Sequence, residues 1–328
     1  MGREKTDSLT TLALRLLIGF EQHISSQLLL RHSNNCSSWV EPWFYSGRGS
    51  CGFTGLHGAA FLGFREIVAA LLTTKEWNIN ATDATGRTAL AWVAVEGHED
   101  IVKILLQLKD VNPNVADAKS GRTPLWWATG NRCDGIVKLL LEREDVDLNT
   151  PDTLHGRTPL WWAAEGRREG IVKLLLEREG VDSNTPDTLY GRTPLWWAAE
   201  GGHEGIVKLL LERDDINPNS PDTLYCRTPL WWAAQRGYEG IVRLLLERED
   251  TDPNTPDTLY GRTPLWWAGQ RGSVGAVRLL LERDDINPNT ADTRYGRTPL
   301  LWAVEGGHGA VVRLLLERED INPDAPGL

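Results

Sequence analysis

Apolar positions along most of this chain fall into two short stretches in every 35 residues, and a polar segment follows each pair. In the copy at 193–219, Thr193 and Pro194 predict a helix start, because threonine caps helices and proline fits the first helical position. This first helix should cover 195–200 and end near Gly201 and Gly202. A second helix is predicted over 204–213, where Ile206, Val207, Leu209, Leu210 and Leu211 form a wide apolar stripe.

The segment that follows, Asp214 to Asp222, contains two prolines together with asparagines and aspartates. Such a composition cannot continue a helix and favours an extended loop with turns. We call this loop the finger. One copy of the pattern therefore predicts a helix, a turn, a second helix and a long finger.

The copies are marked by one phrase, Gly-Arg-Thr-Pro-Leu-Trp-Trp-Ala, which is complete at four places and varied at four more. Together they predict eight units that start near residues 52, 86, 121, 156, 191, 226, 261 and 296. A fixed period of this length predicts a solenoid, in which each unit buries its apolar face against its neighbours. We expect residues 52–328 to form the repeat array.

The two ends differ from the middle. Residues 1–51 are expected to form an N-terminal helical cap, with two helices over 7–31, followed by an irregular connector. The last unit repeats the interior pattern without added polar residues, although an end unit normally needs a polar outer face. This difference predicts either that the last unit frays or that the chain is a piece of a longer array, and it leaves end-to-end self-association through that unit open.

The unit resembles the ankyrin repeat, on Thr193-Pro194-Leu195, Ala198-Ala199, Gly202-His203 and Ile206-Val207. The resemblance implies an all-α ankyrin-repeat solenoid and a non-catalytic role in binding other proteins. The period exceeds the family's usual length of about 33 residues by additions in the finger. The repeats also resemble the ankyrin tails of fungal NACHT-type receptor proteins, although no GxxxxGK[ST] loop occurs here.

The family's histidine in the phrase Thr-Pro-Leu-His remains only at His57; tryptophan or, once, leucine replaces it in the later full copies. In the family that histidine forms hydrogen bonds at the start of the first helix. Those bonds must therefore be made in another way here, or be lost.

The tryptophan pairs are the main candidate for chemistry. At about 100° per residue, Leu195, Ala198 and Ala199 define the buried side of the first helix. Trp196 then points sideways toward a neighbouring unit, which predicts a packing row. Trp197 lies away from the core, between positions that vary. Its row is either a second packing row or the floor of a binding groove, and it comprises Trp127, Trp162, Trp197, Trp232 and Trp267.

Two positions beside this second row vary between units, as does one position in the turn, whereas most others are uniform. Such variation is expected of a binding surface, and neutral drift at exposed positions would produce it too. Arg236 and Arg271 form a basic spot that suits an acidic partner segment. The candidate partner-binding residues at these positions are Glu165, Arg168, Glu200, His203, Gln235, Arg236, Tyr238, Gln270 and Arg271.

Two more rows recur on the fingers, an arginine row that includes Arg192 and an aspartate row that includes Asp187. Fixed spacing predicts that the two rows pair with each other. In the turn, Arg132 and Arg167 take the place of glycines such as Gly202. If that position requires a positive φ, the arginines are strained there.

Composition and charge exclude several classes of function. A net charge of −10 argues against nucleic-acid binding, which needs a basic face. Four cysteines without paired spacing indicate a reducing, cytoplasmic setting, and no segment is apolar enough to span a membrane. His32, Cys36, Cys51 and His57 match no usual zinc spacing, and no catalytic arrangement stands out, so neither a metal, a cofactor nor an enzyme is expected.

These observations predict a non-catalytic scaffold that binds a protein or peptide in the concave groove of the array. One alternative is a structural spacer for a neighbouring domain. Another is a small-molecule receptor or an enzyme that uses the tryptophan-lined groove. A spacer should tolerate substitutions in the groove, and a receptor or enzyme should show a defined pocket with convergent polar groups.

Overall fold

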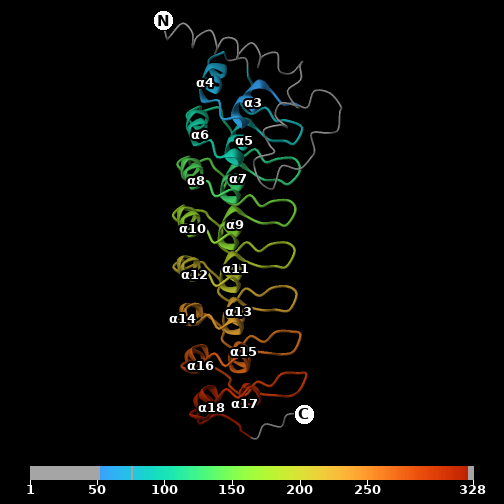
Figure 1. Ribbon diagram of the computed structural model, residues 1–328, viewed down its shortest axis with the longest axis vertical. Coiled ribbons are helices and arrows are strands. Elements are labelled where there is room, and N and C mark those ends of the chain that lie inside the picture. The colour runs from blue at the N-terminus through green and yellow to red at the C-terminus, as the bar shows by residue number, and fades with distance from the viewer. Residues whose placement is uncertain (1–51, 75–76, 324–328) are drawn as a thin grey trace. The chain divides into compact units, whose positions relative to one another are not determined.

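The computed structural model describes residues 52–74 and 77–323, and every regular element in these residues is an α-helix (Figure 1). The expected cap over 1–51, including His32, Cys36 and Cys51, lies outside the described residues. Within the described part, no helix has the length and apolar character needed to cross a membrane. The helices come in pairs, as the sequence predicts.

The chain divides into two compact parts, each of which contains several of the 35-residue repeats. We call residues 1–150 unit 1 and residues 151–328 unit 2, and we describe them separately. The described residues of unit 1 contain three helix pairs: α3 (Gly55–Phe61) with α4 (Arg65–Thr73), α5 (Ala89–Glu96) with α6 (Glu99–Leu106), and α7 (Pro124–Gly130) with α8 (Asp134–Leu141).

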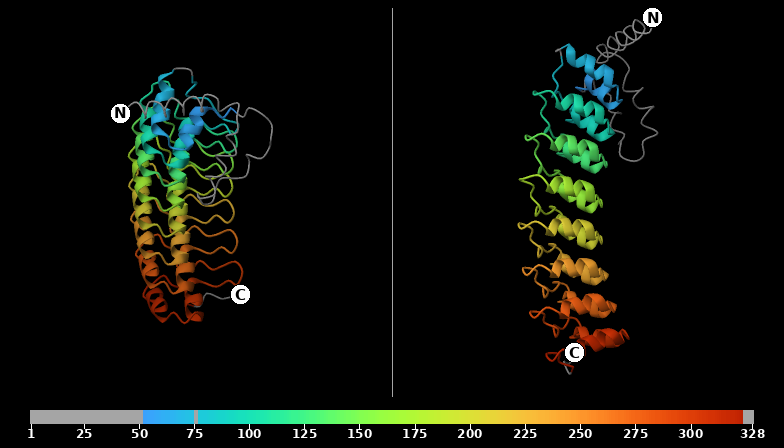
Figure 2. Two further views of the ribbon diagram at one scale, coloured as in Figure 1. Left: turned by 45° about the horizontal axis from the view of Figure 1, so that its top comes forward. Right: turned by 90° about the vertical axis from the view of Figure 1, so that its left-hand side faces the viewer.

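The described residues of unit 2 contain five helix pairs. Their odd-numbered helices form one column and their even-numbered helices a second, and the fingers run side by side in both views of Figure 2. The pairs are α9 (Pro159–Glu165) with α10 (Glu169–Leu176), α11 (Pro194–Glu200) with α12 (Glu204–Leu211), α13 (Pro229–Arg236) with α14 (Glu239–Leu246), α15 (Pro264–Arg271) with α16 (Val274–Leu281), and α17 (Pro299–Glu305) with α18 (Gly309–Leu316).

The core of each repeat lies between its two helices. In the repeat of α11 and α12, Leu195 and Ala198 are fully buried, and Val207 and Leu210 of α12 meet them at 0% exposure. This arrangement confirms the helical-wheel prediction. The second helix ends at Leu211, two residues earlier than predicted. Beyond it, Arg213 forms a bidentate ion pair with Asp215, with hydrogen bonds of 2.8 and 2.7 Å.

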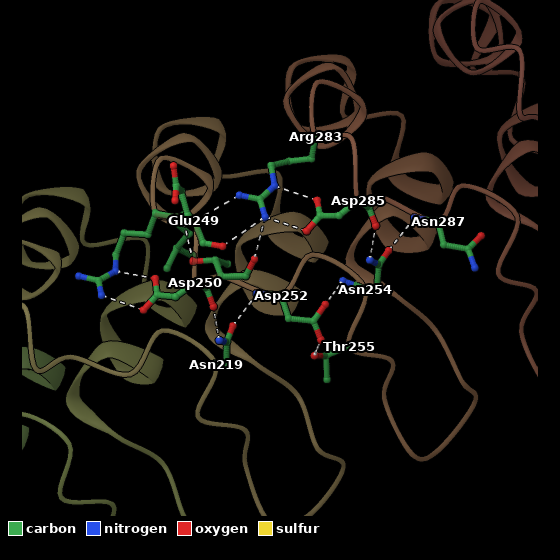
Figure 3. A network of polar contacts seen from close by, with 12 residues as sticks. Asn219, Glu249, Asp250, Asp252, Asn254, Thr255, Arg283, Asp285 and Asn287 are labelled. Atoms are coloured by element: carbon green, nitrogen blue, oxygen red, sulfur yellow. Dashed lines mark hydrogen bonds and ion pairs between the residues drawn. The ribbon is translucent and has the colours of Figure 1, made fainter.

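The base of each finger is joined to the next by a polar ladder, shown for one stretch of unit 2 in Figure 3. The side chain of Asn254 donates to the backbone carbonyl of Asp285 at 2.7 Å and accepts from the backbone N–H of Asn287 at 2.7 Å. Arg283 binds both carboxylate oxygens of Asp285, and this bonding lowers the pKa of that carboxyl. The same asparagine bonds recur one repeat earlier, from Asn219.

The turn between the two helices requires a left-handed backbone. Gly202, Gly237 and Gly272 have φ of 74°, 73° and 70°. Arg132 and Arg167 take the same conformation, with φ of 64° and 59°, which bears out the predicted positive φ at that position. Cys226, in the place of the glycine that opens the phrase, is a third such residue at 53°.

The last described repeat exposes more apolar surface than the repeats before it. Val304 and Leu316 are 57% and 53% exposed, whereas the corresponding Ala199 is fully buried and Leu211 is half-buried. These exposed side chains agree with the expectation of a weaker last repeat. Self-association through this surface stays a prediction.

Replacing Arg167 by glycine should raise the free energy of unfolding by about 1 kcal/mol, because glycine adopts a positive φ without the cost that a Cβ imposes. The measurement is a urea unfolding curve of the full chain. Arg168→Gly is the matched control, since Arg168 has a φ of −105° and should lose stability on the same change. A midpoint for Arg167→Gly at or below that of the wild type would contradict this account.

Amide hydrogen exchange should be fastest, among the repeats, in residues 296–323. Local opening governs exchange, and a repeat with fewer buried apolar contacts opens at lower cost. The comparison is with the equivalent amides of α13 and α14 in the same spectrum. Equal protection of the two repeats would show that the last repeat has stabilising contacts beyond those described.

Candidate binding face

The start of the first helix fixes where both tryptophans point. Thr193 has an extended backbone, and its hydroxyl accepts from the backbone N–H of Trp196 at 3.2 Å. Pro194 follows at the first helical position, where no N–H is needed. This cap sets Trp196 and Trp197 at the third and fourth helical positions, and it recurs in all described repeats that carry a tryptophan pair.

The first tryptophan of each pair lies in the interface between repeats. Trp196 is 1% exposed, and its indole Nε1–H donates to the backbone carbonyl of Arg227, in the next repeat, at 2.8 Å. Three more bonds of this kind occur in unit 2, from Trp161 to Arg192, Trp231 to Arg262 and Trp266 to Arg297, at 2.9, 2.9 and 3.1 Å. The first row is therefore a packing row that also carries a hydrogen bond.

His57 shows what the tryptophans replace. Its Nε2 lies 3.1 Å from the carbonyl of Arg87 in the next repeat and 3.0 Å from that of Ala81 in the finger of its own repeat, while its Nδ1 lies 3.1 Å from the backbone nitrogen of Thr54. The indole keeps the bond to the arginine carbonyl but has no acceptor for the threonine N–H. The family's hydrogen bond between repeats is thus made by a different ring.

The second tryptophan of each pair is half-buried, less enclosed than the first. The ring centroid of Trp197 lies 5.4 Å from that of Trp196 and 5.2 Å from that of Trp161 in the preceding repeat, both in edge-to-face geometry. Trp232 and Trp267 repeat this arrangement. In these three repeats the second-row ring therefore packs against two first-row rings and still keeps part of its surface exposed to solvent, so that packing and binding are compatible roles.

Trp92 occupies the second-row position in unit 1 but is only 4% exposed. Phe53 and Phe61 pack against it edge to face, at 6.2 and 5.3 Å between centroids. Its Nε1–H donates to Asp83 at 2.9 Å. The open second row of unit 2 is thus a property of particular repeats rather than of the helix position itself.

The arginine row stacks on these rings instead of pairing with the aspartate row, so that this prediction was wrong. The Cζ of Arg192 lies 4.2 Å from the ring centroid of Trp196, 5.1 Å from that of Trp197 and 4.3 Å from that of Tyr190. Asp187 accepts from the backbone N–H groups of Leu189 and Tyr190, at 3.0 and 2.6 Å. The guanidinium lies on the ring faces because a cation is attracted to them. The carboxylate instead accepts hydrogen bonds from backbone N–H groups of the finger.

Burial lowers the pKa of Arg262 in the same row, whereas Asp292 and Asp257 act to raise it. Arg192, Arg227 and Arg262 thus form no ion pair with the aspartate row among the described residues, although the charges of the two rows influence each other.

The variable residues beside the second row form a cluster with it in the repeats of α13 and α15. Arg236 and Arg271 are exposed, and their Cζ atoms lie 5.6 and 6.0 Å from the ring centroids of Trp232 and Trp267. Arg236 also donates to Glu200 at 2.6 Å. Gln235 and Gln270 lie beside them, half-buried, and Glu165 is exposed at the same position of α9.

The turn residues have a second role that the sequence did not indicate. A Cβ added to Gly202 would lie 2.9 Å from the ring of Tyr238 in the next repeat, so that the tyrosine closely covers this turn. Burial lowers the pKa of His203, and Arg167 lowers it further. Arg168, His203 and Tyr238 are all half-buried, so their part in binding a partner stays a prediction.

Comparisons with known proteins agree with this geometry. A family model described as "Ankyrin repeats (3 copies)" matches residues 24–117, 56–152, 107–187, 135–222, 171–257 and 230–325. The crystal structure of the ankyrin repeat domain of Bcl-3, a unique member of the IkappaB protein family, is similar over 71% of this chain and 100% of that chain, with 25% identity and a TM-score of 0.60. EF0377, an ankyrin repeat protein, is similar over 60% of this chain and 97% of that chain, with 26% identity and a TM-score of 0.54. No curated protein matches this chain.

The bond from the first row to the next repeat can be tested with two substitutions of Trp196. Trp196→His should be less destabilising than Trp196→Phe, although histidine is the smaller side chain. Histidine can still donate to the carbonyl of Arg227, as His57 does to the carbonyl of Arg87. Phenylalanine loses this bond, worth about 0.5–1.5 kcal/mol, although the carbonyl keeps the bond that it accepts from the backbone N–H of Asp222 at 3.0 Å. Urea unfolding of both variants is the measurement, and a phenylalanine variant as stable as the histidine variant would argue against the bond.

Proposed function

The chain belongs to the ankyrin-repeat family, whose members generally mediate protein–protein interactions and are typically non-catalytic, and on that premise we propose that it is a scaffold that binds a protein or peptide. The proposed binding surface is the aromatic face, which we define as the second-row tryptophans of unit 2 together with the variable residues at the ends of the same helices. It consists of Trp162, Trp197, Trp232, Trp267, Glu165, Glu200, Gln235, Arg236, Gln270 and Arg271.

The observation that supports this proposal most is the difference between the two tryptophan rows. Trp231 is 1% exposed and donates its indole N–H to the next repeat, whereas Trp232 keeps part of its ring open to solvent. Other second-row rings also keep an exposed part while their indole N–H groups donate to aspartates, Trp162 to Asp152 and Trp197 to Asp187. A large, rigid, partly open aromatic ring is a typical anchor for a partner. Polar residues that differ from repeat to repeat surround that ring, and they can supply specificity.

A structural spacer needs the first row and the polar ladder of the fingers, but it has no use for the open rings. A small-molecule receptor would need a pocket with convergent polar groups. A hollow of about 430 Å³ does occur in unit 1, and it is lined by turn and second-helix residues such as Gly97, His98 and Lys103 rather than by the tryptophan rows. These observations favour the scaffold.

The likeness of the repeats to the tails of fungal NACHT-type receptors extends the proposal. In such a receptor the array would recognise the protein that triggers the response, and the aromatic face would be the recognition surface. The same experiment applies, because the extended proposal also requires a partner on this face.

Replacing Trp232 by alanine should weaken binding by about 2 kcal/mol, which is roughly 30-fold. The ligand is a peptide selected on the full chain from a random peptide library, and the measurement is its dissociation constant by fluorescence anisotropy. Leu224→Ala, at a finger position that is 52% exposed, is the control and should change affinity by less than about twofold.

Trp231→Ala separates folding from binding. It should lower the free energy of unfolding by about 3–5 kcal/mol, as expected for a fully buried aromatic side chain. Trp232→Ala should have a smaller effect on unfolding, and circular dichroism must show it folded at the binding temperature. If peptides selected on the full chain bind Trp232→Ala as well as the wild type, the aromatic face is not the binding surface.

A further inference from the structure

Two neighbouring repeats of unit 2 carry the same pair of variable residues. Gln235 and Arg236 end α13, and Gln270 and Arg271 end α15. Both helices have 8 residues and stop at a left-handed glycine, whereas α9, α11 and α17 have 7. The additional residue is the arginine itself, so that each guanidinium is carried on the last turn of a helix and not on a loose loop.

The charges at this place do not balance. Arg236 pairs with Glu200, which precedes it by 36 positions and belongs to the repeat before. The residue 36 positions before Arg271 is Gln235, which has no charge. No ion pair involves Arg271 among the described residues of unit 2. The two arginines therefore have one carboxylate partner between them, Glu200, on a chain whose net charge is −10.

Two other acidic groups of these and the next repeat already have partners. Glu305 of the next repeat pairs with Arg297, and Glu239 at the start of α14 pairs with Arg243 on its own helix. The guanidinium of Arg271 is exposed, and its Cζ lies 6.0 Å from the ring centroid of Trp267. A cation beside a partly open ring is suited to bind a carboxylate and an apolar group of one ligand together.

The spacing of the two repeats limits what such a ligand looks like. Neighbouring helices pack roughly 8–10 Å apart, which sets the order of separation between Arg236 and Arg271. A polyproline II segment has three residues per turn and a rise of about 3.1 Å. Side chains at every third position therefore lie on one face, about 9 Å apart. Aromatic surfaces are also the usual docking sites of proline-rich segments.

We propose that the partner segment on the aromatic face is an extended, acidic polyproline II segment with a carboxylate at every third position. One carboxylate binds Arg271, and the next binds the guanidinium of Arg236 beside Glu200, which binds only one of the guanidinium nitrogens. The intervening prolines pack on Trp232 and Trp267. This inference rests on the proposed function, since it names the chemistry of the ligand for the same face.

The test uses the full chain and three fluorescein-labelled peptides of fifteen residues. The first repeats Pro-Pro-Glu, the second repeats Pro-Pro-Gln, and the third has the composition of the first with all glutamates contiguous. Fluorescence anisotropy should show the first peptide binding at least tenfold more tightly than either of the others. The affinity should fall as salt is raised, because the contacts are ionic.

The matched protein variants have the same change in net charge. Arg236→Gln combined with Arg271→Gln should weaken binding of the Pro-Pro-Glu peptide at least tenfold. Arg243→Gln combined with Arg278→Gln changes exposed arginines on α14 and α16 of the same two repeats, and should leave the affinity within about twofold. Equal losses in the two double variants, equal binding of the contiguous peptide, or no binding of the first peptide would each overturn the inference.

Failure here is distinguishable from failure of the proposed function. If library-selected peptides carry no excess of acidic residues and still lose affinity in Trp232→Ala, the aromatic face binds peptides of another chemistry. If those peptides are insensitive both to Trp232→Ala and to the Arg236/Arg271 double variant, the aromatic face itself is refuted.

Discussion

The hydrogen bond from a buried indole to the backbone of the next repeat is the constraint on which unit 2 depends. A fully buried tryptophan N–H needs an acceptor, and here the acceptor is the carbonyl of the arginine at the second position of the next phrase, for example Arg227 for Trp196. This bond fixes the distance and rotation between neighbouring repeats. The edge-to-face contact of Trp197 with Trp161 of the preceding repeat depends on this spacing, whereas Arg192 stacks on the two rings of its own repeat.

The polar ladder at the base of the fingers joins neighbouring repeats through a second set of bonds. Asn254 links its own finger to the backbone at Asp285 and Asn287, and Arg283 reaches back to carbonyls of the preceding repeat. Neighbouring repeats are thus joined by the indole bonds and by the polar ladder. With the interfaces secured in this way, the residues at the helix ends are free to differ, which is where Arg236 and Arg271 occur.

The sequence alone predicts most of the local structure, because the threonine cap, the proline after it and the apolar stripe of the second helix are local signals. It also predicts the positive φ at Arg167, since glycine occupies that position in other copies. The same comparison would have found Cys226, which replaces a glycine of the phrase. The stacking of Arg192 on Trp196 was missed because an arginine and an aspartate at fixed spacing indicate an ion pair until the positions of the rings are known. The indole bond depends on the separation between repeats, which no single copy contains.

The central claim is that the two tryptophan rows have different roles, the first joining repeats and the second meeting a partner. The most direct test is to follow the indole N–H signals of the full chain by ¹⁵N NMR, assigned by single substitutions. The account predicts that Trp161, Trp196, Trp231 and Trp266 resist hydrogen exchange and keep their shifts when a bound peptide is added, while Trp232 and Trp267 exchange faster and move. Rapid exchange of the first row, or peptide-induced shifts confined to it, would contradict the account.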